Sequence, residues 1–541
     1  MLFSGALSVG VSIDEHYHVL DFRGWAWGAD PSKSLFGAHG LSTQVLYHLG
    51  SSVLGAETLG SVAFSSEAFA TRHTITGLMG LATGLAVMGI VWSITRDSFS
   101  SLWAGAAILA VPTFLGHSMF NPKDIPTALG YTLYTFSCVL VVARLREFKR
   151  SLIRDFWLIS VTAFGFWLVV GTRYIFVGAM LITAIFTMTS VVFLWRHENK
   201  VFLRITKVCG PWLLGNLFGF IAVLFTNPCI IAEPVNCENA FQVFSRAFGS
   251  SSDVTFSAPT LVAGRFETPI DPAFWLLPLA LVAGLPLSII VLALFGAIFG
   301  PENLKPRPLT GSPNSLLGRG CIVVMTGLLW MQVLLVPSLV IFSREEIYDR
   351  ARHHLYTYPA VAALAGIGLC LVLNARFRQK SLPWTYKWGA AVVGVLFLFI
   401  PLAEGARLWP YNYVYVNPIA SLRGIEGQWE TDYWAVSLRE ALDYVPVDQP
   451  FSVVGPFWAV KPFMADRGSS PLTARANVGE VHVIEAYRPG LGWNGLPKEC
   501  RDIVKIQRNL RGHVVPIAQT GICPRSLGLG VSYLDVLAHD P

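Results

Sequence analysis

Two acidic residues and two histidines follow directly on the first apolar run of the chain, in the segment IDEHYH. Asp14 and Glu15 are adjacent, so their carboxylates project in different directions, and one can meet a substrate while a partner holds the other. A carboxylate at a membrane edge can act as a general base on a hydroxyl or bind a divalent cation. His16 and His18 are candidate metal ligands, although two histidines at this spacing lack a third ligand. The alternative is a solvated acidic helix end.

A second polar group lies in GHSMFNPKDIPTA, which two prolines stiffen. Lys123 carries a point charge that could meet a phosphate, Asn121 is a candidate substrate contact, and Asp124 is a further acidic group. The alternative is an ordinary Asn-Pro turn with solvated charges. Arg173, in VVGTRY, lies between two long apolar runs, where a phosphate contact and simple snorkelling to the interface are both open.

The segment YDRARHHLYTYPA brings further basic and aromatic residues together. Arg350, Arg352 and His353 precede an apolar run, and Tyr356 follows them closely. A basic pocket lined by aromatic rings suits the phosphate of a lipid-linked substrate. The alternative is an interfacial belt of aromatic and basic residues.

The segment PYNYVYVNPI, followed by ETDYW, is dense in aromatic and acidic residues. Its candidate substrate-binding residues are Tyr411, Tyr415, Glu430 and Asp432. The aromatic rings could form either a belt at the membrane interface or a surface on which a sugar stacks, and composition leaves both open.

The segments that must position these residues are strongly apolar. The chain has 541 residues, of which 53% are hydrophobic and only 14% charged, and its mean hydropathy is +0.52. Soluble domains usually carry about 25% charged residues. The net charge of +6 needs no nucleic-acid partner, because basic residues beside membrane spans account for it.

Apolar run length predicts about eleven membrane-spanning helices. They are Leu2–Ile13, Ile75–Ile94, Leu102–Phe120, Thr127–Ala143, Phe156–Gly171, Ile175–Trp195, Val208–Phe225, Phe274–Ile298, Cys321–Phe342, Leu355–Leu373 and Trp388–Leu402. The first run is short, which fits a truncated span or a start further upstream. A signal peptide is the alternative, but no basic n-region and no small-residue cleavage site precede Asp14.

Lys and Arg concentrate in alternate connections between these runs, which predicts a cytoplasmic N-terminus and a tail outside from about Ala403 onward. In this frame all five polar clusters lie on the outer face. The eight cysteines agree with it. Cys229 and Cys237 share an outer loop and Cys500 and Cys523 share the tail, which predicts two disulfides, with four free thiols as the alternative.

The predicted fold class is therefore an α-helical polytopic membrane protein with a C-terminal extracytoplasmic α/β domain. Residues 1–402 are expected to form the transmembrane domain, with long outer loops at 14–74 and 227–272. Residues 403–541 are expected to form the α/β domain, because short β-like runs such as VHVIEAY and HVVPIA alternate there with turns and one predicted helix.

Over nearly the whole chain, these motifs resemble the membrane glycosyltransferases of the C superfamily. The similarity is greatest to the bacterial branch that resembles protein O-mannosyltransferases and lipid A aminoarabinose transferases. The matching segments are the acidic pair after the first run, NPKDIPTA, GRFETPIDPAFWLLP, YDRARHHLYTYPA, and PYNYVYVNPI with ETDYW. The ordered set is more specific than any one segment.

The resemblance implies an enzyme that takes a sugar from a polyprenyl phosphate or diphosphate on the outer leaflet. It implies transfer to a hydroxyl or amine with inversion at the anomeric carbon. Asp14, supported by Glu15, would be the base or acceptor binder, and Asp124 a second acidic contributor. The residues that would stabilise the leaving phosphate are Lys123, Arg173, Arg352 and His353.

The resemblance also implies a location in a bacterial inner or plasma membrane. In some relatives a divalent cation, Mg²⁺ or Mn²⁺, assists. The acceptor could be a glycan, a lipid or a protein.

Three other functions remain to be weighed against this one. A transporter or flippase would place charges along a path near the bilayer midplane, where the predicted spans are almost free of charge. A non-catalytic scaffold would tolerate the loss of Asp14. An enzyme like the O-antigen ligases would share the chemistry but differ in its loop plan.

Overall fold

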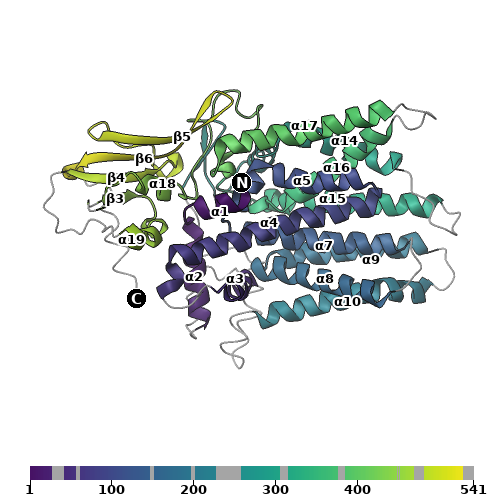
Figure 1. Ribbon diagram of the computed structural model, residues 1–541. Coiled ribbons are helices and arrows are strands. Elements are labelled where there is room, and N and C mark those ends of the chain that lie inside the picture. The colour runs from purple at the N-terminus through teal and green to yellow at the C-terminus, as the bar shows by residue number, and fades with distance from the viewer. Residues whose placement is uncertain are drawn as a thin grey trace.

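Long apolar helices run side by side through one part of the molecule, and a small sheet lies beyond one end of them (Figure 1). The computed structural model describes residues 1–26, 42–55, 61–145, 151–196, 201–226, 258–304, 315–375, 384–447, 449, 451–467 and 480–527. The predicted pair Cys229 and Cys237 lies outside these residues.

Seven helices of the described residues are long and apolar enough to cross a membrane. They are α4 (Ser66–Thr95), α7 (Asp124–Arg144), α8 (Leu152–Thr172), α9 (Phe176–Trp195), α10 (Val201–Phe225), α15 (Ser315–Ser343) and α17 (Trp384–Leu408). Helices α13 (Leu276–Ala283) and α14 (Leu287–Asn303) are bent by 112° and make an eighth span if they count as one. The chain is thus a multi-pass membrane protein, and the predicted number of eleven spans is not confirmed.

The predicted span Leu2–Ile13 is replaced by two helices that meet at a break. Helix α1 (Leu2–Ser8) has seven residues, which at about 1.5 Å per residue is far too short to cross a bilayer. Helix α2 (Ile13–Ala26) begins after the break. Between them the chain packs against the C-terminal part, because the amide of Gly10 donates to Val436 O at 3.1 Å. A Cβ on Gly10 would lie 2.2 Å from that oxygen, so the close approach requires glycine.

Two further predicted spans are shorter or interrupted. The run Leu102–Phe120 becomes α5 (Ser98–Ala110) and α6 (Pro112–His117), because a proline at the second helix start cannot continue the hydrogen bonding of the first. Helix α16 (Thr357–Ala375) contains a shorter apolar stretch, Thr357–Leu373. It packs against α14, α5 and α4 within the bundle.

The crossing of α14 and α16 depends on two glycines. A Cβ on Gly296 would lie 2.0 Å from Leu364 O, and a Cβ on Gly368 would lie 2.0 Å from Leu292 O. Each glycine therefore lets the backbone of the other helix approach closely, as small residues do at helix crossings in membranes.

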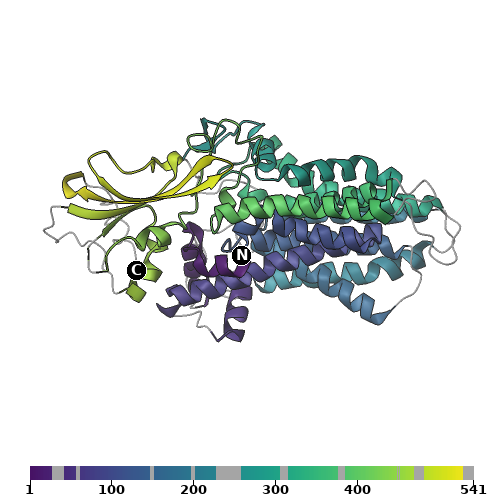
Figure 2. The same cartoon turned by 45° about the horizontal axis from the view of Figure 1, so that its top comes forward.

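The segment predicted as the first outer loop contains short helices at the end of the bundle nearest the sheet (Figures 1 and 2). Its described elements are α2, α3 (Ser42–Val53) and η2 (Ser61–Phe64). The start of α2 is fixed by its third residue, because the Ser12 amide donates to Glu15 Oε2 at 2.7 Å. Asp14 therefore lies in the first turn of a helix whose start is held by a hydrogen bond.

The C-terminal part contains a four-stranded sheet with the order β3-β4-β6-β5. Its strands are β3 (Phe451–Val454), β4 (Glu480–Ala486), β5 (Arg501–Leu510) and β6 (His513–Pro524). Strands β3 and β4 are parallel and the other pairs antiparallel. The helices α18 (Leu438–Leu442) and α19 (Lys461–Arg467) accompany the sheet. The predicted disulfide between Cys500 and Cys523 is confirmed, whereas the predicted domain boundary at 402/403 stays a prediction.

A small hairpin joins the bundle to this C-terminal part. Strands β1 (Thr260–Val262) and β2 (Arg265–Glu267) pair with each other, and Val262 also pairs with Trp429. Buried side chains of α1, the hairpin, the segment after α17 and the sheet form one continuous hydrophobic cluster. The polar motifs therefore meet where the bundle and the C-terminal part pack together.

Candidate active site

Asp14 lies between two basic side chains that come from distant parts of the chain. Its Oδ2 is 3.3 Å from Lys123 Nζ and 3.4 Å from Arg352 NH1. Lys123 directly precedes α7, and Arg352 begins the short helix η3 (Arg352–His354) before α16. The structure thus brings together three of the residues that the sequence motifs single out.

The charges around Asp14 keep it ionised. Burial alone would raise the pKa of Asp14, but Lys123, Arg352 and His18 outweigh this effect and hold the pKa well below its usual range. The pKa of His353 is also far below its usual value, because loss of water around the half-buried ring and the positive charges of Arg352 and Arg173 disfavour a further proton. His353 is therefore neutral at pH 7, and its ring packs edge-on against Tyr348 with centroids 4.6 Å apart.

Asp124 forms the next ion pair of the site. It binds Arg173 NH2 through Oδ1 and accepts a hydrogen bond from Asn121 Nδ2 at 2.8 Å. The same amide group lies 2.9 Å from His117 Nδ1, and His117 Nε2 lies 3.1 Å from the hydroxyl of Tyr433. Asn121 and Asp124 therefore support Arg173, and they connect it to the C-terminal part of the chain.

Three arginines of the site have buried nitrogen atoms without a hydrogen-bond partner among the described residues. These atoms are Arg173 Nε, Arg350 NH1 and Arg352 Nε; Arg488 Nε and Arg511 Nε, nearer the sheet, likewise make no hydrogen bond within the described residues. Arg350 is 5% exposed, donates through NH2 to Tyr415 O at 2.7 Å and lies over the ring of Trp429. Most buried polar groups are hydrogen-bonded, so the unpartnered nitrogens of Arg173 and Arg352, next to the ion pairs of Asp124 and Asp14, are donors that a ligand could satisfy.

Sequence reasoning missed two charged residues that continue this site. Asp349 Oδ2 lies 3.2 Å from Arg352 NH2, and Asp349 Oδ1 lies 2.5 Å from Arg488 NH2. Arg488 Nε is in turn 3.5 Å from Glu430 Oε1. Glu430, a predicted substrate-binding residue, therefore contacts Arg488 rather than the cations around Asp14. Asp349 stands within the YDRARHH motif and could have been found there. Arg488 follows β4 and carried no sequence signal.

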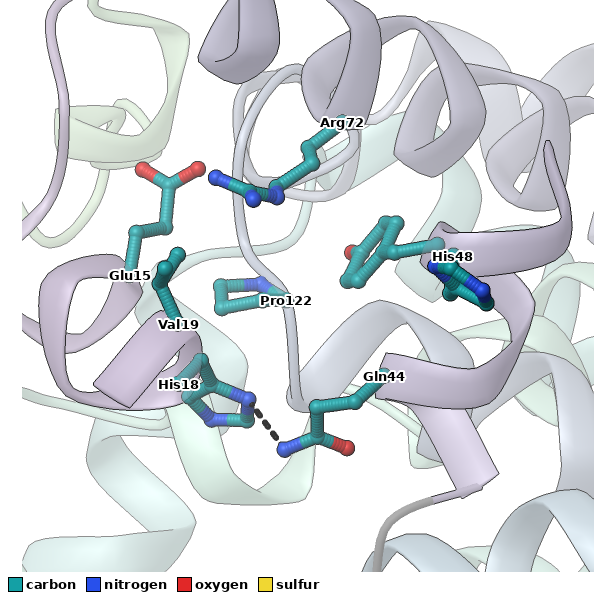
Figure 3. Close-up of a pocket in the computed structure, with 8 residues that line it drawn as sticks. Glu15, His18, Val19, Gln44, His48, Arg72 and Pro122 are labelled. Carbon is teal, nitrogen blue, oxygen red and sulfur yellow. Dashed lines mark hydrogen bonds between the residues drawn. The ribbon is translucent and has the colours of Figure 1, made fainter. Parts of the chain in front are cut away.

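Glu15 faces away from the cations that hold Asp14. Its Oε1 lies 2.8 Å from His73 Nε2, and its Oε2 accepts the Ser12 amide. It borders a pocket of about 390 Å³, including space open to solvent, between α2, α3 and α4 (Figure 3). In Figure 3 the guanidinium of Arg72 points toward the Glu15 carboxylate, and His18 bonds to Gln44. Glu15 thus anchors the helix that carries Asp14.

The histidines predicted as metal ligands do not converge on a metal. His16 stacks on Trp458, with ring centroids 5.8 Å apart, and His18 Nδ1 lies 2.8 Å from Gln44 Nε2. Asp14 already has two cationic neighbours, which repel a divalent cation. In the parts of the chain that the structure describes, no group of three His, Cys, Asp or Glu side chains could hold a metal ion. The described surroundings of Asp14, His16 and His18 therefore form no preformed site for Mg²⁺ or Mn²⁺.

Four predicted substrate-binding residues have protein partners of their own. The hydroxyls of Tyr411 and Tyr415 donate to Glu440 at 2.6 Å and to Glu404 at 2.9 Å. The Tyr356 hydroxyl lies 2.8 Å from His354 Nδ1, inside the bundle. Asp432 accepts hydrogen bonds from Tyr413 and Ser437. None of these contacts involves Asp14, Lys123 or Arg352.

Comparison with protein families finds no family that matches the chain, and comparison with curated proteins finds no relative. The structure is similar to that of ArnT from Cupriavidus metallidurans bound to undecaprenyl phosphate, at 13% identity and a TM-score of 0.45 over 96% of this chain and 95% of that one. The apo state of that ArnT gives 11% identity and a TM-score of 0.46 over the same shares.

A second similar protein is the archaeal oligosaccharyltransferase AglB from Archaeoglobus fulgidus, in complex with an inhibitory peptide and a dolichol-phosphate. The identity is 12% and the TM-score 0.43, over 85% of this chain and 60% of that one. At these TM-scores the likeness transfers no residue role and no activity to this chain.

Proposed function

We propose that this chain is a membrane glycosyltransferase that moves a sugar from a polyprenyl-phosphate-linked donor to an acceptor on the outer face of the membrane. The observation that supports it most strongly is the cluster of buried cations at Asp14, where Lys123 and Arg352 contact the carboxylate and where Arg352 and Arg173 each have a nitrogen without a partner among the described residues. A phosphate offers several charged oxygens to such donors, and arginine binds phosphate in a directed geometry. The position of the site, at the end of the apolar bundle, suits a phosphate whose lipid tail stays in the membrane.

In the proposed reaction, an acceptor oxygen forms a bond to the anomeric carbon while the bond from that carbon to the phosphate oxygen breaks. The electron pair of the broken bond leaves with the polyprenyl phosphate. Lys123, Arg173 and Arg352 stabilise the negative charge that develops there. The acceptor proton passes to the carboxylate of Asp14, and attack opposite the phosphate inverts the anomeric carbon.

Phosphate binding would also make Asp14 a better base. In the structure Lys123 and Arg352 hold the pKa of Asp14 low, and so strongly acidic a group accepts a proton poorly. A bound phosphate shares the same two cations and adds negative charge nearby. Both effects raise the pKa of Asp14 toward its usual range, so the base becomes effective when the donor is bound.

The test compares Asp14→Asn with a matched variant at the other end of the bundle. Asp155 forms a similar partly buried pair with Arg144 at 2.8 Å; helix α7 begins directly after Lys123 and ends at Arg144, so the two pairs lie at opposite ends of it. Release of undecaprenyl phosphate from a panel of undecaprenyl-phosphate-linked sugars is the readout. We expect Asp14→Asn to lower turnover by at least about 100-fold, as loss of a general base does.

Asp155→Asn should leave turnover within about 2-fold, because its pair with Arg144 lies at the other end of α7 from Lys123 and a partly exposed pair contributes little to stability. Wild-type turnover by Asp14→Asn would refute the base assignment. A wild-type protein that binds no lipid phosphate and turns over no donor would instead favour the non-catalytic scaffold.

A further inference from the structure

A chain of alternating charges leads from Asp14 into the C-terminal part of the molecule. Arg352 contacts Asp14 through NH1 at 3.4 Å and Asp349 through NH2 at 3.2 Å. Asp349 uses its other oxygen to bind Arg488 NH2 at 2.5 Å. The side chains of Arg352, Asp349 and Arg488 are 6%, 3% and 4% exposed, so water screens these contacts little.

Arg488 belongs to the sheet-containing part of the chain. It follows β4, and its backbone forms an isolated bridge with Trp493. Its NH1 donates to Tyr433 O at 2.8 Å, and its Nε faces Glu430. Two nitrogens of the guanidinium are thus hydrogen-bonded, NH1 to Tyr433 O and NH2 to Asp349, and Nε lies at a charge-contact distance from Glu430. These contacts hold Arg488 in one orientation toward Asp349.

Asp349 divides its charge between two arginines. If Arg488 were replaced by a neutral residue, Arg352 would be the remaining arginine in contact with Asp349, and the full negative charge of the carboxylate would act on it. That attraction would compete with the attraction of Arg352 for Asp14 and for a bound phosphate. Removal of one partner from a buried ion pair also leaves an uncompensated charge.

The backbone around Asp349 also indicates that contacts from the C-terminal part hold this residue in place. Asp349 and Arg350 both have positive φ angles, +51° and +63°, a conformation that side chains with a Cβ rarely adopt. Such a pair persists only where surrounding contacts hold it. Two residues of the C-terminal part supply such contacts: Arg488 binds Asp349, and Tyr415 O accepts a hydrogen bond from Arg350 NH2. The centroid of the Trp434 ring also lies 4.2 Å from the guanidinium carbon of Arg352.

We infer that Arg488 is a positioning residue of the lipid-phosphate site, which acts through Asp349 to keep Arg352 directed at Asp14 and at the phosphate. The membrane helices and the C-terminal part then form one site, and neither part binds the phosphate fully without the other. This inference rests on the proposed function, because affinity for a lipid phosphate is its readout.

The test uses the full chain in lipid nanodiscs and undecaprenyl phosphate as the probe. We expect Arg488→Gln to weaken binding by about 10-fold, the loss typical of a removed supporting contact. Arg488→Lys should recover part of the affinity, because an ammonium group can still neutralise one oxygen of Asp349. In an Asp349→Asn background, Arg488→Gln should weaken binding by less than about 2-fold, because the residue through which it acts is already changed.

Arg511 provides the matched control. It contacts Glu404 at 2.6 Å and also bonds to Val416 O, so it fastens the sheet to α17 without contacting the charge chain. Arg511→Gln should lower the unfolding temperature but leave the affinity for undecaprenyl phosphate unchanged. Equal losses of affinity in Arg488→Gln and Arg511→Gln would mean that general docking of the C-terminal part matters and would overturn the inference.

The remaining outcomes separate this inference from the proposed function. If wild-type protein binds undecaprenyl phosphate and Arg488→Gln binds it equally well, the inference fails alone. If wild-type protein does not bind it, the proposed function fails and the inference with it. If Arg488→Gln does not fold, Arg488→Lys and Asp349→Asn carry the same comparison, and unchanged affinity in both overturns the inference.

Discussion

Two adjacent carboxylates have separate tasks in this protein. The sequence predicts that Asp14 and Glu15 project in different directions, and the structure places them so. Asp14 faces the cations, whereas Glu15 anchors the start of α2 and meets His73. That the two side chains diverge could be predicted from the geometry of a helix alone. The partner of Glu15 could not be predicted, because His73 belongs to another helix, α4.

Lys123 tests the phosphate role of the site at the level of one residue. It is buried beside Asp14, and its ammonium group is a compact charge for a phosphate oxygen. We expect Lys123→Ala to raise the KM for the lipid-linked donor by roughly 10- to 100-fold, the range for a lost charged contact. The KM for the acceptor should change much less. Kinetics with a radiolabelled lipid-linked sugar measure both, and an effect on the acceptor alone would contradict the phosphate role.

Glu430 gives the site a pH-dependent stability. Burial raises the pKa of its carboxyl to about 7, although Arg488 opposes the shift. A carboxyl whose pKa is raised by folding binds its proton more tightly in the folded protein than in the unfolded chain. Its contribution to the free energy of unfolding is therefore full below the usual pKa of 4.5 and is lost as the pH rises through about 7.

We therefore expect wild type to lose stability relative to Glu430→Gln as the pH rises from about 5 to about 8. Unfolding temperatures of both proteins over this range provide the measurement. A constant difference between the two proteins would mean that Glu430 does not titrate in the folded protein over this range.

At the scale of elements, run length identified the long helices but missed their breaks. The apolar runs around α4, α7 and α9 correspond to single helices. The run that ends near Phe120 is divided at Pro112, and the run after Phe274 bends by 112° between α13 and α14. Hydropathy averages over such breaks, because proline and glycine are only a small fraction of a window.

Helix packing predicts a strong effect at Gly368. A leucine there would place its Cβ 2.0 Å from Leu292 O, so α14 and α16 would have to separate. We expect Gly368→Leu to cost roughly 1–3 kcal/mol or more, as overpacking does. Gly389 in α17 is a matched control, because a Cβ there meets nothing within 4 Å. Thermal unfolding in detergent should separate the two variants, and equal unfolding temperatures would refute the close crossing.

At the scale of the whole molecule, the sequence motifs identified many of the residues of the site but not the contacts that link the site to the C-terminal part. Asp14, Lys123 and Arg352 come together from segments more than 100 residues apart because the helices that carry them share one end of the bundle. The structure gives the hydroxyls of Tyr411 and Tyr415, both predicted to contact substrate, protein partners instead: Tyr411 bonds to Glu440 of α18, and Tyr415 bonds to Glu404 of α17. Composition could not separate a sugar-binding tyrosine from one that packs two parts of a chain together.

The disulfide between Cys500 and Cys523 should stabilise the C-terminal sheet. It closes a segment with a sequence separation of 23 residues, and a loop of this size contributes about 3 kcal/mol in the chain-entropy account. We expect Cys500→Ser combined with Cys523→Ser to lower the unfolding temperature of the sheet. Binding of undecaprenyl phosphate below that temperature should be retained, because neither cysteine contacts the charge chain. An unchanged unfolding temperature would contradict this role.

The most direct measurement of the central claim is an experimental density map of the full chain in nanodiscs with undecaprenyl phosphate bound. We expect a phosphate within hydrogen-bonding distance of Lys123, Arg173 and Arg352, beside Asp14, with the lipid chain directed into the bundle. The same map should show the unpartnered nitrogens of Arg173 and Arg352 facing phosphate oxygens. A phosphate bound at the opposite end of the bundle, near Arg144 and Asp155, would contradict it.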